Sequence, residues 1–115
     1  MSQKTMQAEP YEFDFDPHST ALVVIDMQRD FVEAGGFGEA LGNDVSPLQA
    51  VIAPCRRMLD AAREIGMMVI HTREGHSRDL ADCQPTKIAR GRGATRIGDP
   101  GPVGRSLVRG ERGHD

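Results

Sequence analysis

The sequence has no tryptophan, one tyrosine and two cysteines, and it lacks any apolar run near the roughly 18 residues of a membrane helix. Its core therefore depends on Ile, Val, Leu, Met and Ala. The two cysteines, Cys55 and Cys83, do not have the spacing of a metal-ligand pair, so we expect two reduced thiols. The N-terminus has no apolar signal segment, which favours a cytoplasmic protein.

The net charge of −3 gives no electrostatic reason for binding nucleic acid or an anionic membrane. The last third is locally basic, with "ARGRGATR" at residues 89–96 and further arginines at 105, 109 and 112. This segment has no aromatic residue on which a base could stack. We therefore favour a basic loop that covers a pocket or a subunit contact, and we predict no nucleic-acid or membrane partner.

The apolar pattern predicts one βαβ unit. Residues 20–26 and 67–71 are predicted strands, because they contain the continuous apolar runs 22–25 and 67–70, typical of parallel strands that are covered on both faces. The segment 47–66 between them has helical spacing, with Pro54 in the first turn of the main helix and Gly66 at its end. A strand, helix and strand of these lengths predict a right-handed crossover and hence parallel strands.

The remaining segments are predicted to be irregular. Residues 1–19 form an arm with little regular structure, although the alternating aromatics at 11–15 would let part of it lie across a surface. Residues 33–46 and 73–115 are interpreted as loops. Two strands and one helix do not enclose a core. We therefore predict that residues 20–115 are part of a three-layer α/β/α, Rossmann-like domain with a parallel sheet. The chain supplies its first βαβ unit and a long loop.

Asp26 is the last residue of the first predicted strand, at the sheet edge where open α/β folds bind ligands. A partly desolvated carboxylate in this position can act as a general base. The alternative is a structural role, in which the side chain caps the following turn by accepting backbone N–H groups. Position alone does not decide between the two roles.

The stretch "VVIDMQRDF", the glycine-rich loop, the amphipathic helix and "MMVIHTREGH" together resemble the N-terminal half of the isochorismatase-like cysteine hydrolases. The segments "HTREGHSRDLADC" and "IGDPGPVGRSLVRGERGHD" most closely resemble the biuret hydrolase branch, near the ureido and N-carbamoyl amidohydrolases. The resemblance covers residues 20–115. It implies a cofactor-free amidohydrolase that acts on a small linear amide or ureido compound such as biuret. It also implies a homo-oligomer, commonly a tetramer.

The resemblance implies roles for two residues. Asp26 matches the base of an Asp–Lys–Cys triad, in which the cysteine attacks the carbonyl and forms a thioester-type intermediate. Phe31 matches the aromatic residue that forms a wall of the substrate pocket. Gln28 lies within the motif, but we assign it no role in the chemical reaction. The family's lysine and cysteine lie downstream, and neither Lys87 nor either cysteine occupies their positions. We therefore expect the chain alone to be inactive.

A metal site is a further alternative for the segment after the second strand. His71, Glu74 and His76 suggest metal ligands. Glu74 and His76 fall where the nicotinamidase branch has the aspartate and first histidine of its metal site, but Leu80 stands where the second histidine is needed. We therefore predict no metal, and instead hydrogen bonds and ion pairs at the pocket rim, with Glu74 paired to the neighbouring arginine. The glycines of "GDPGPVG" at 98–104 do not lie between a strand and a helix, so they predict a rigid turn.

Two other classes of function remain open. The chain could be a non-catalytic truncated remnant, or a half-domain that depends on a partner chain. It could also be a small binding module that uses its basic loop. A downstream segment that carries a lysine and a cysteine would favour the enzyme.

Overall fold

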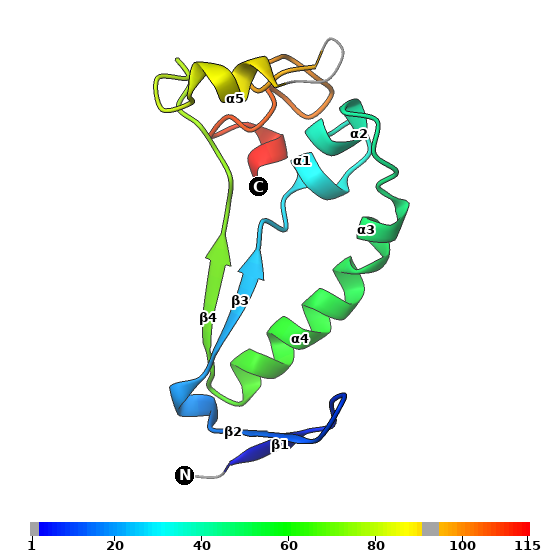
Figure 1. Ribbon diagram of the computed structural model, residues 1–115, viewed down its shortest axis with the longest axis vertical. Helices are drawn as coiled ribbons and strands as arrows, with labels where there is room; N and C mark the ends of the chain where they lie inside the picture. Colours follow the sequence, from blue (N-terminus) through cyan, green and yellow to red (C-terminus); the bar gives the residue numbers. More distant parts are fainter. Residues whose placement is uncertain (1–2, 91–94) are drawn as a thin grey trace. The chain divides into compact units, whose positions relative to one another are not determined.

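The computed structural model describes residues 3–90 and 95–115, which divide into two compact units (Figure 1). The first unit comprises the described residues up to Val24 together with Ala53–His71. The second comprises Ile25–Ile52 and the described part of Thr72–Asp115. Within these residues, no helix combines the length and the apolar character that crossing a membrane would require.

The predicted βαβ elements lie in the first unit, except for one residue at an end of each element. Strands β3 (Ala21–Ile25) and β4 (Met68–Thr72) pair side by side and run in the same direction (Figure 1). Helix α4 (Ile52–Glu64) precedes β4, and Pro54 lies in its first turn, where backbone N–H groups have no intrahelical partner. Gly66 has a left-handed φ of 76°, as expected for a residue that ends a helix. The α/β class and the parallel strand pair are therefore confirmed.

The N-terminal arm is more regular than its sequence suggests. Strands β1 (Lys4–Met6) and β2 (Phe13–Phe15) pair antiparallel and are followed by a 3-10 helix at Pro17–Ser19. The Thr5 hydroxyl donates to the Asp14 carboxylate across this pair at 2.7 Å, and the two aromatic rings of β2 stack 6.4 Å apart. The prediction of little regular structure was wrong, because such cross-strand and same-face contacts stabilise a local hairpin.

The described residues cover only one of the two faces of the β3–β4 sheet. Leu22 lies beside α4 at an apolar cavity of about 390 Å³, which β1 and β2 also line. On the other face Val23, Met68 and Ile70 are 45%, 65% and 42% exposed. Because parallel sheets are normally buried on both faces, this exposure is unusual for a finished α/β domain.

We expect the purified 115-residue chain to self-associate or to unfold without a cooperative transition. The reason is that, within residues 3–90 and 95–115, β3 and β4 pair only with each other and have an exposed apolar face. Such free edges and faces favour pairing with other chains. Light scattering after size-exclusion chromatography and thermal circular dichroism would measure both properties. A cooperative thermal transition from a monomer would contradict the expectation.

The second unit consists of short helices around a small core. The helices are α1 (Arg29–Val32), α2 (Phe37–Ala40), α3 (Ser46–Ala50), α5 (Pro85–Ala89) and a 3-10 helix at Arg112–His114. Buried apolar residues at its centre are Cys83, Ile97 and Leu107. The prediction of loops over residues 33–46 and 73–115 was therefore wrong for α2 and α5. The scattered apolar residues of the last third converge into a core that linear periodicity does not reveal.

The "GDPGPVG" segment forms the predicted turn. The backbone N–H groups of Gly101 and Gly104 each donate to the other's carbonyl oxygen, at 3.1 and 3.0 Å. Gly104 has a φ of 96°, which only glycine adopts readily. The segment thus reverses the chain, as its proline and glycine content indicates.

Candidate functional site

Asp26 comes directly after β3, is partly buried and has an unusual left-handed backbone with a φ of 49°. Its N–H group donates to both the carbonyl and the hydroxyl oxygen of Thr72, at 3.2 and 3.1 Å. The Thr72 hydroxyl in turn donates to Asp26 Oδ1 at 2.8 Å. Oδ2 has no hydrogen-bond partner among residues 3–90 and 95–115. One carboxylate oxygen is therefore anchored and the other is available to accept a proton.

The carboxylate of Asp26 does not cap the following turn. The turn is closed instead by the main chain, where the Gln28 N–H group donates to the Asp26 carbonyl oxygen at 2.9 Å. The one described hydrogen bond of the side chain is accepted from the hydroxyl group of Thr72, the last residue of β4. This geometry is compatible with Asp26 as a general base, and that role stays a prediction.

Phe31, the other predicted site residue, lies on α1. Its ring is partly buried and packs against the core formed by Cys83, Ile97 and Leu107. Its role as a wall of a substrate pocket therefore stays a prediction. Asp26 and Phe31 belong to the same short segment, so contacts that hold the backbone of this segment in place position both residues.

Gln28 fixes that segment and had no assigned role in the sequence interpretation. The side chain is fully buried, and its Nε2 group donates to the carbonyl oxygens of Glu74 and His114, both at 2.9 Å. Its Oε1 atom accepts from the Glu74 N–H group at 2.8 Å. One amide thus joins three chain segments. An amide between a strand and a helix start is the signal that could have suggested this, because it both donates and accepts.

Asp30 is a second buried polar residue that the sequence interpretation missed. Its side chain is fully buried, and its two oxygens accept from the backbone N–H groups of Phe37 at 3.3 Å and Leu107 at 2.9 Å. Gly113 packs directly on this carboxylate, since a Cβ atom there would lie 2.6 Å from Oδ1. Asp30 therefore connects α1, the start of α2 and the C-terminal segment.

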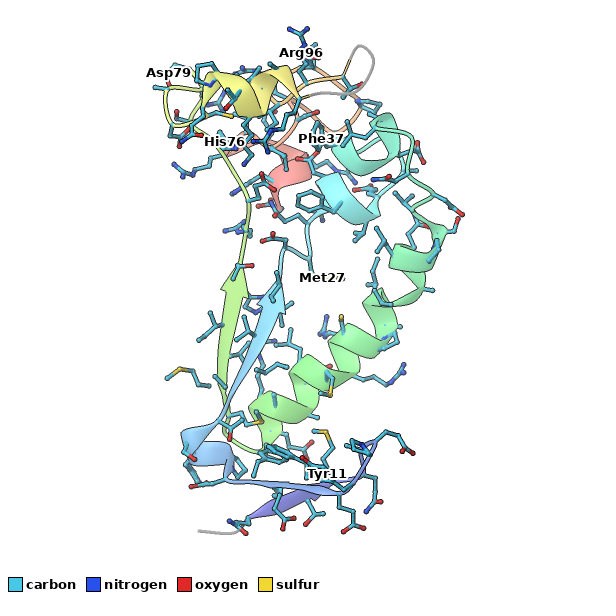
Figure 2. All side chains as sticks on the ribbon, in the orientation of Figure 1. Tyr11, Met27, Phe37, His76, Asp79 and Arg96 are labelled. Carbon is cyan, nitrogen blue, oxygen red and sulfur yellow. The ribbon has the colours of Figure 1, made fainter. Side chains whose placement is uncertain are left out.

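A network of charged side chains surrounds Glu74. The Lys87 ammonium lies 2.5 Å from Glu74 Oε1 and 3.3 Å from His76 Nε2. Nδ1, the other ring nitrogen of His76, lies 3.5 Å from Asp82 Oδ1. His76 is labelled in Figure 2. Lys87 belongs to helix α5 and not to the predicted loop. It therefore tethers α5 to the segment that Gln28 holds.

The predicted ion pairs near the second strand are present, but with other partners. Glu74 pairs with Lys87 and not with Arg73, whose guanidinium lies 3.1 Å from the Asp115 carboxylate. His71 is exposed and forms no hydrogen bond with a described residue. In the part of the chain that the structure describes, no three His, Cys, Asp or Glu side chains gather at a metal-binding distance.

Two aspartates organise the turn that follows His76. A hydrogen bond from the Ser77 N–H group is the main cause that lowers the pKa of Asp82. The pKa of Asp79 is lowered mainly by a hydrogen bond from the Ala81 N–H group. Both carboxylates are therefore held in their charged form, and Asp82 also lies 3.5 Å from the Arg109 guanidinium.

Most described arginines of the last third are used within the fold. Arg105 donates to the carbonyl oxygens of Gly98 and Arg78, at 2.9 and 2.7 Å. Arg112 lies 2.6 Å from the Glu33 carboxylate. These contacts argue against a free basic surface. Residues 91–94 of the predicted basic loop lie outside the described residues.

The two thiols are both free, as predicted. Cys83 lies in a bend before α5, within the stretch predicted to be a loop, but it is 5% exposed and belongs to the core of the second unit. Cys55 is partly buried on α4. Core packing explains Cys83 without a chemical role.

The Isochorismatase domain family matches residues 20–115. The chain is also similar to a ureidoacrylate amidohydrolase RutB of Agrobacterium fabrum, with 36% identity over 68% of this chain and 34% of that protein. A ureidoacrylate amidohydrolase RutB of Pantoea ananatis is 32% identical over 98% of this chain and 47% of that protein. The chain thus spans about a third to a half of the length of these relatives. By the match over most of its length, the chain belongs to the isochorismatase family.

Proposed function

We propose that this chain is the N-terminal part of a cysteine-dependent amidohydrolase with Asp26 as its general base. The observation that carries the proposal is the Asp26 carboxylate, which is anchored through Oδ1 by Thr72 and leaves Oδ2 available. It stands directly after a parallel strand, where α/β folds bind their ligands. Phe31 would wall the substrate pocket from α1.

The proposed chemistry needs a cysteine and a lysine beyond the 115 residues. Asp26 takes the proton of the cysteine thiol, and the resulting thiolate attacks the carbonyl carbon of the substrate. The C–N bond breaks, the nitrogen leaves as ammonia or an amine after it gains the proton, and a thioester remains. Water then hydrolyses the thioester and restores the thiol. The lysine favours the thiolate electrostatically.

The proposed substrate is a small linear amide or ureido compound. Two relatives carry the name ureidoacrylate amidohydrolase, which indicates a ureido carbonyl as the site of attack. The resemblance of the later motifs to biuret hydrolases favours a biuret-like molecule. No cofactor takes part in the proposed reaction, and assembly of the completed enzyme as a homo-oligomer stays a prediction.

A fusion protein would test the proposal. Residues 1–115 would be joined to the part of the Pantoea ananatis relative that lies beyond the segment this chain matches. We expect the fusion to release ammonia from biuret or ureidoacrylate and the 115-residue chain to release none, because the nucleophile is absent from the chain.

The matched control is the same fusion with Cys55→Ala and Cys83→Ala, which should keep its activity. Hydrolysis by the chain alone that disappears with Cys83→Ala would place the nucleophile within these residues and contradict the proposal. A folded fusion without activity would also contradict it. The DNA that follows codon 115 gives an independent check, since a continuation that encodes a strand and a cysteine is expected.

A half-domain that depends on a partner chain is the second candidate. The exposed apolar face of the β3–β4 sheet favours it, because Val23, Met68 and Ile70 need a cover. Co-expression of the chain with a separate segment of the relative would distinguish this candidate from a covalently continuous enzyme. A binding module that uses the basic loop is the weakest of the three candidate functions, because most of the described arginines of the last third contact other residues of the chain.

A further inference from the structure

The second unit contains a cavity of about 240 Å³ that the proposed function does not use. Its apolar wall consists of Phe37, Leu41, Ile97 and Leu107, and its polar side chains are Glu74, Lys87 and Arg90. Phe37 is labelled in Figure 2. Neither Asp26 nor Phe31 lines the cavity, so the inference drawn from it is independent of the proposed hydrolase.

The charges at this cavity do not cancel. Lys87 and Arg90 contribute two positive charges, and Glu74 contributes one negative charge. Glu74 Oε1 and His76 Nε2 lie within hydrogen-bond distance of the Lys87 ammonium, which has three N–H groups, so one remains for a ligand. The Arg90 guanidinium forms no ion pair with a described residue, and its planar donors suit a carboxylate. A ligand with a single negative charge would balance the site.

The size of the cavity limits the rest of the ligand. A cavity of about 150 Å³ is known to accommodate benzene, so this larger one has room for a ring or short chain that also carries a carboxylate. The four apolar side chains would contact the ring or chain. We propose that this pocket binds a small monocarboxylate with an apolar body, held by Arg90 and Lys87.

Benzoate is the probe that tests the proposal, with benzamide as its neutral counterpart of the same shape. Methyl resonances of Ile97, Leu41 and Leu107 in the 115-residue chain would report binding inside the cavity. We expect benzoate to shift these resonances with a Kd on the order of 1 mM, the affinity expected of a ligand this small. Benzamide should bind about tenfold more weakly, because it lacks the charge that Arg90 and Lys87 recognise.

The variant Arg90→Gln should weaken benzoate binding about tenfold and leave benzamide binding unchanged, because it removes the charge-assisted hydrogen bonds. Arg96→Gln is the matched control, since it makes the same charge change at an exposed arginine that does not line the cavity (labelled in Figure 2). It should leave the benzoate Kd as it is. Equal binding of benzoate and benzamide, or equal weakening by both variants, would overturn the proposal.

The measurement also has a defined outcome if the chain is only partly folded. A ligand that binds the folded state alone stabilises it, so benzoate should increase the dispersed Ile97 and Leu107 methyl signals. Benzamide should increase them less at the same concentration. If benzoate neither shifts nor increases these signals at concentrations of about 20 times the expected Kd, the proposal is wrong.

Discussion

Asp26→Asn is expected to lower the rate of amide hydrolysis in the completed fusion by about 10³-fold or more, the upper range of what a general base contributes. Asparagine has the same shape as aspartate, and its carbonyl oxygen can still accept the Thr72 hydroxyl. It has no basic oxygen to take the proton from a thiol. The substitution therefore removes the proposed chemistry and keeps the local structure.

Ammonia release from biuret and ureidoacrylate would measure the effect. Asp60→Asn is the matched control, because Asp60 is an exposed acid on α4 that pairs only with Arg56 among the described residues. Thr72→Val should cause a smaller loss, since it frees Asp26 Oδ1 without removing the base. Turnover by Asp26→Asn at the unaltered rate would exclude Asp26 as the base.

Gln28→Leu is expected to destabilise the second unit by about 3 kcal/mol or more, because each buried polar group that loses its partner costs about 1–3 kcal/mol. Leucine has a similar volume but cannot bond the Glu74 N–H group or the carbonyl oxygens of Glu74 and His114. The segment that carries Asp26 and Phe31 would lose its attachment at the same time.

Urea unfolding of the fusion and hydrogen exchange of the Glu74 amide would measure this loss. A change of 3 kcal/mol corresponds to exchange that is about 150-fold faster. Gln49→Leu, at an exposed position of α3, is the control and should change stability by less than about 0.5 kcal/mol. If the two variants behave alike, the buried amide of Gln28 does not hold the unit together.

The sequence predicts the elements whose residues interact locally. The β3 and β4 runs and the α4 stripe are visible because side chains repeat along each element at its own period. The site of Asp26, at the end of β3, follows from the same pattern. The helical turn at α5 and the hairpin of the arm were missed, because elements of three to five residues carry too few periods.

The long-range polar contacts could not be predicted in the same way. Gln28 bonds a carbonyl 86 positions away in the sequence, and Asp30 bonds an N–H group 77 positions away. No local preference specifies such partners, since they depend on how the irregular segments pack. Phe31 shows the same limit, because the family resemblance implies an aromatic pocket wall, and nothing in the sequence predicts that Phe31 packs against the core of Cys83, Ile97 and Leu107.

The attachment of the last residues has a consequence for the order of folding during synthesis. The carbonyl oxygen of Asp115 accepts a hydrogen bond from the Arg29 N–H group, and that of His114 accepts one from the Gln28 side chain. Gly113 packs on the carboxylate of Asp30. Translation produces α1 long before these partners leave the ribosome. The second unit therefore has to keep its buried polar groups solvated while the intervening residues are made. Its closure is a late, non-local step, whereas the N-terminal hairpin can form at once.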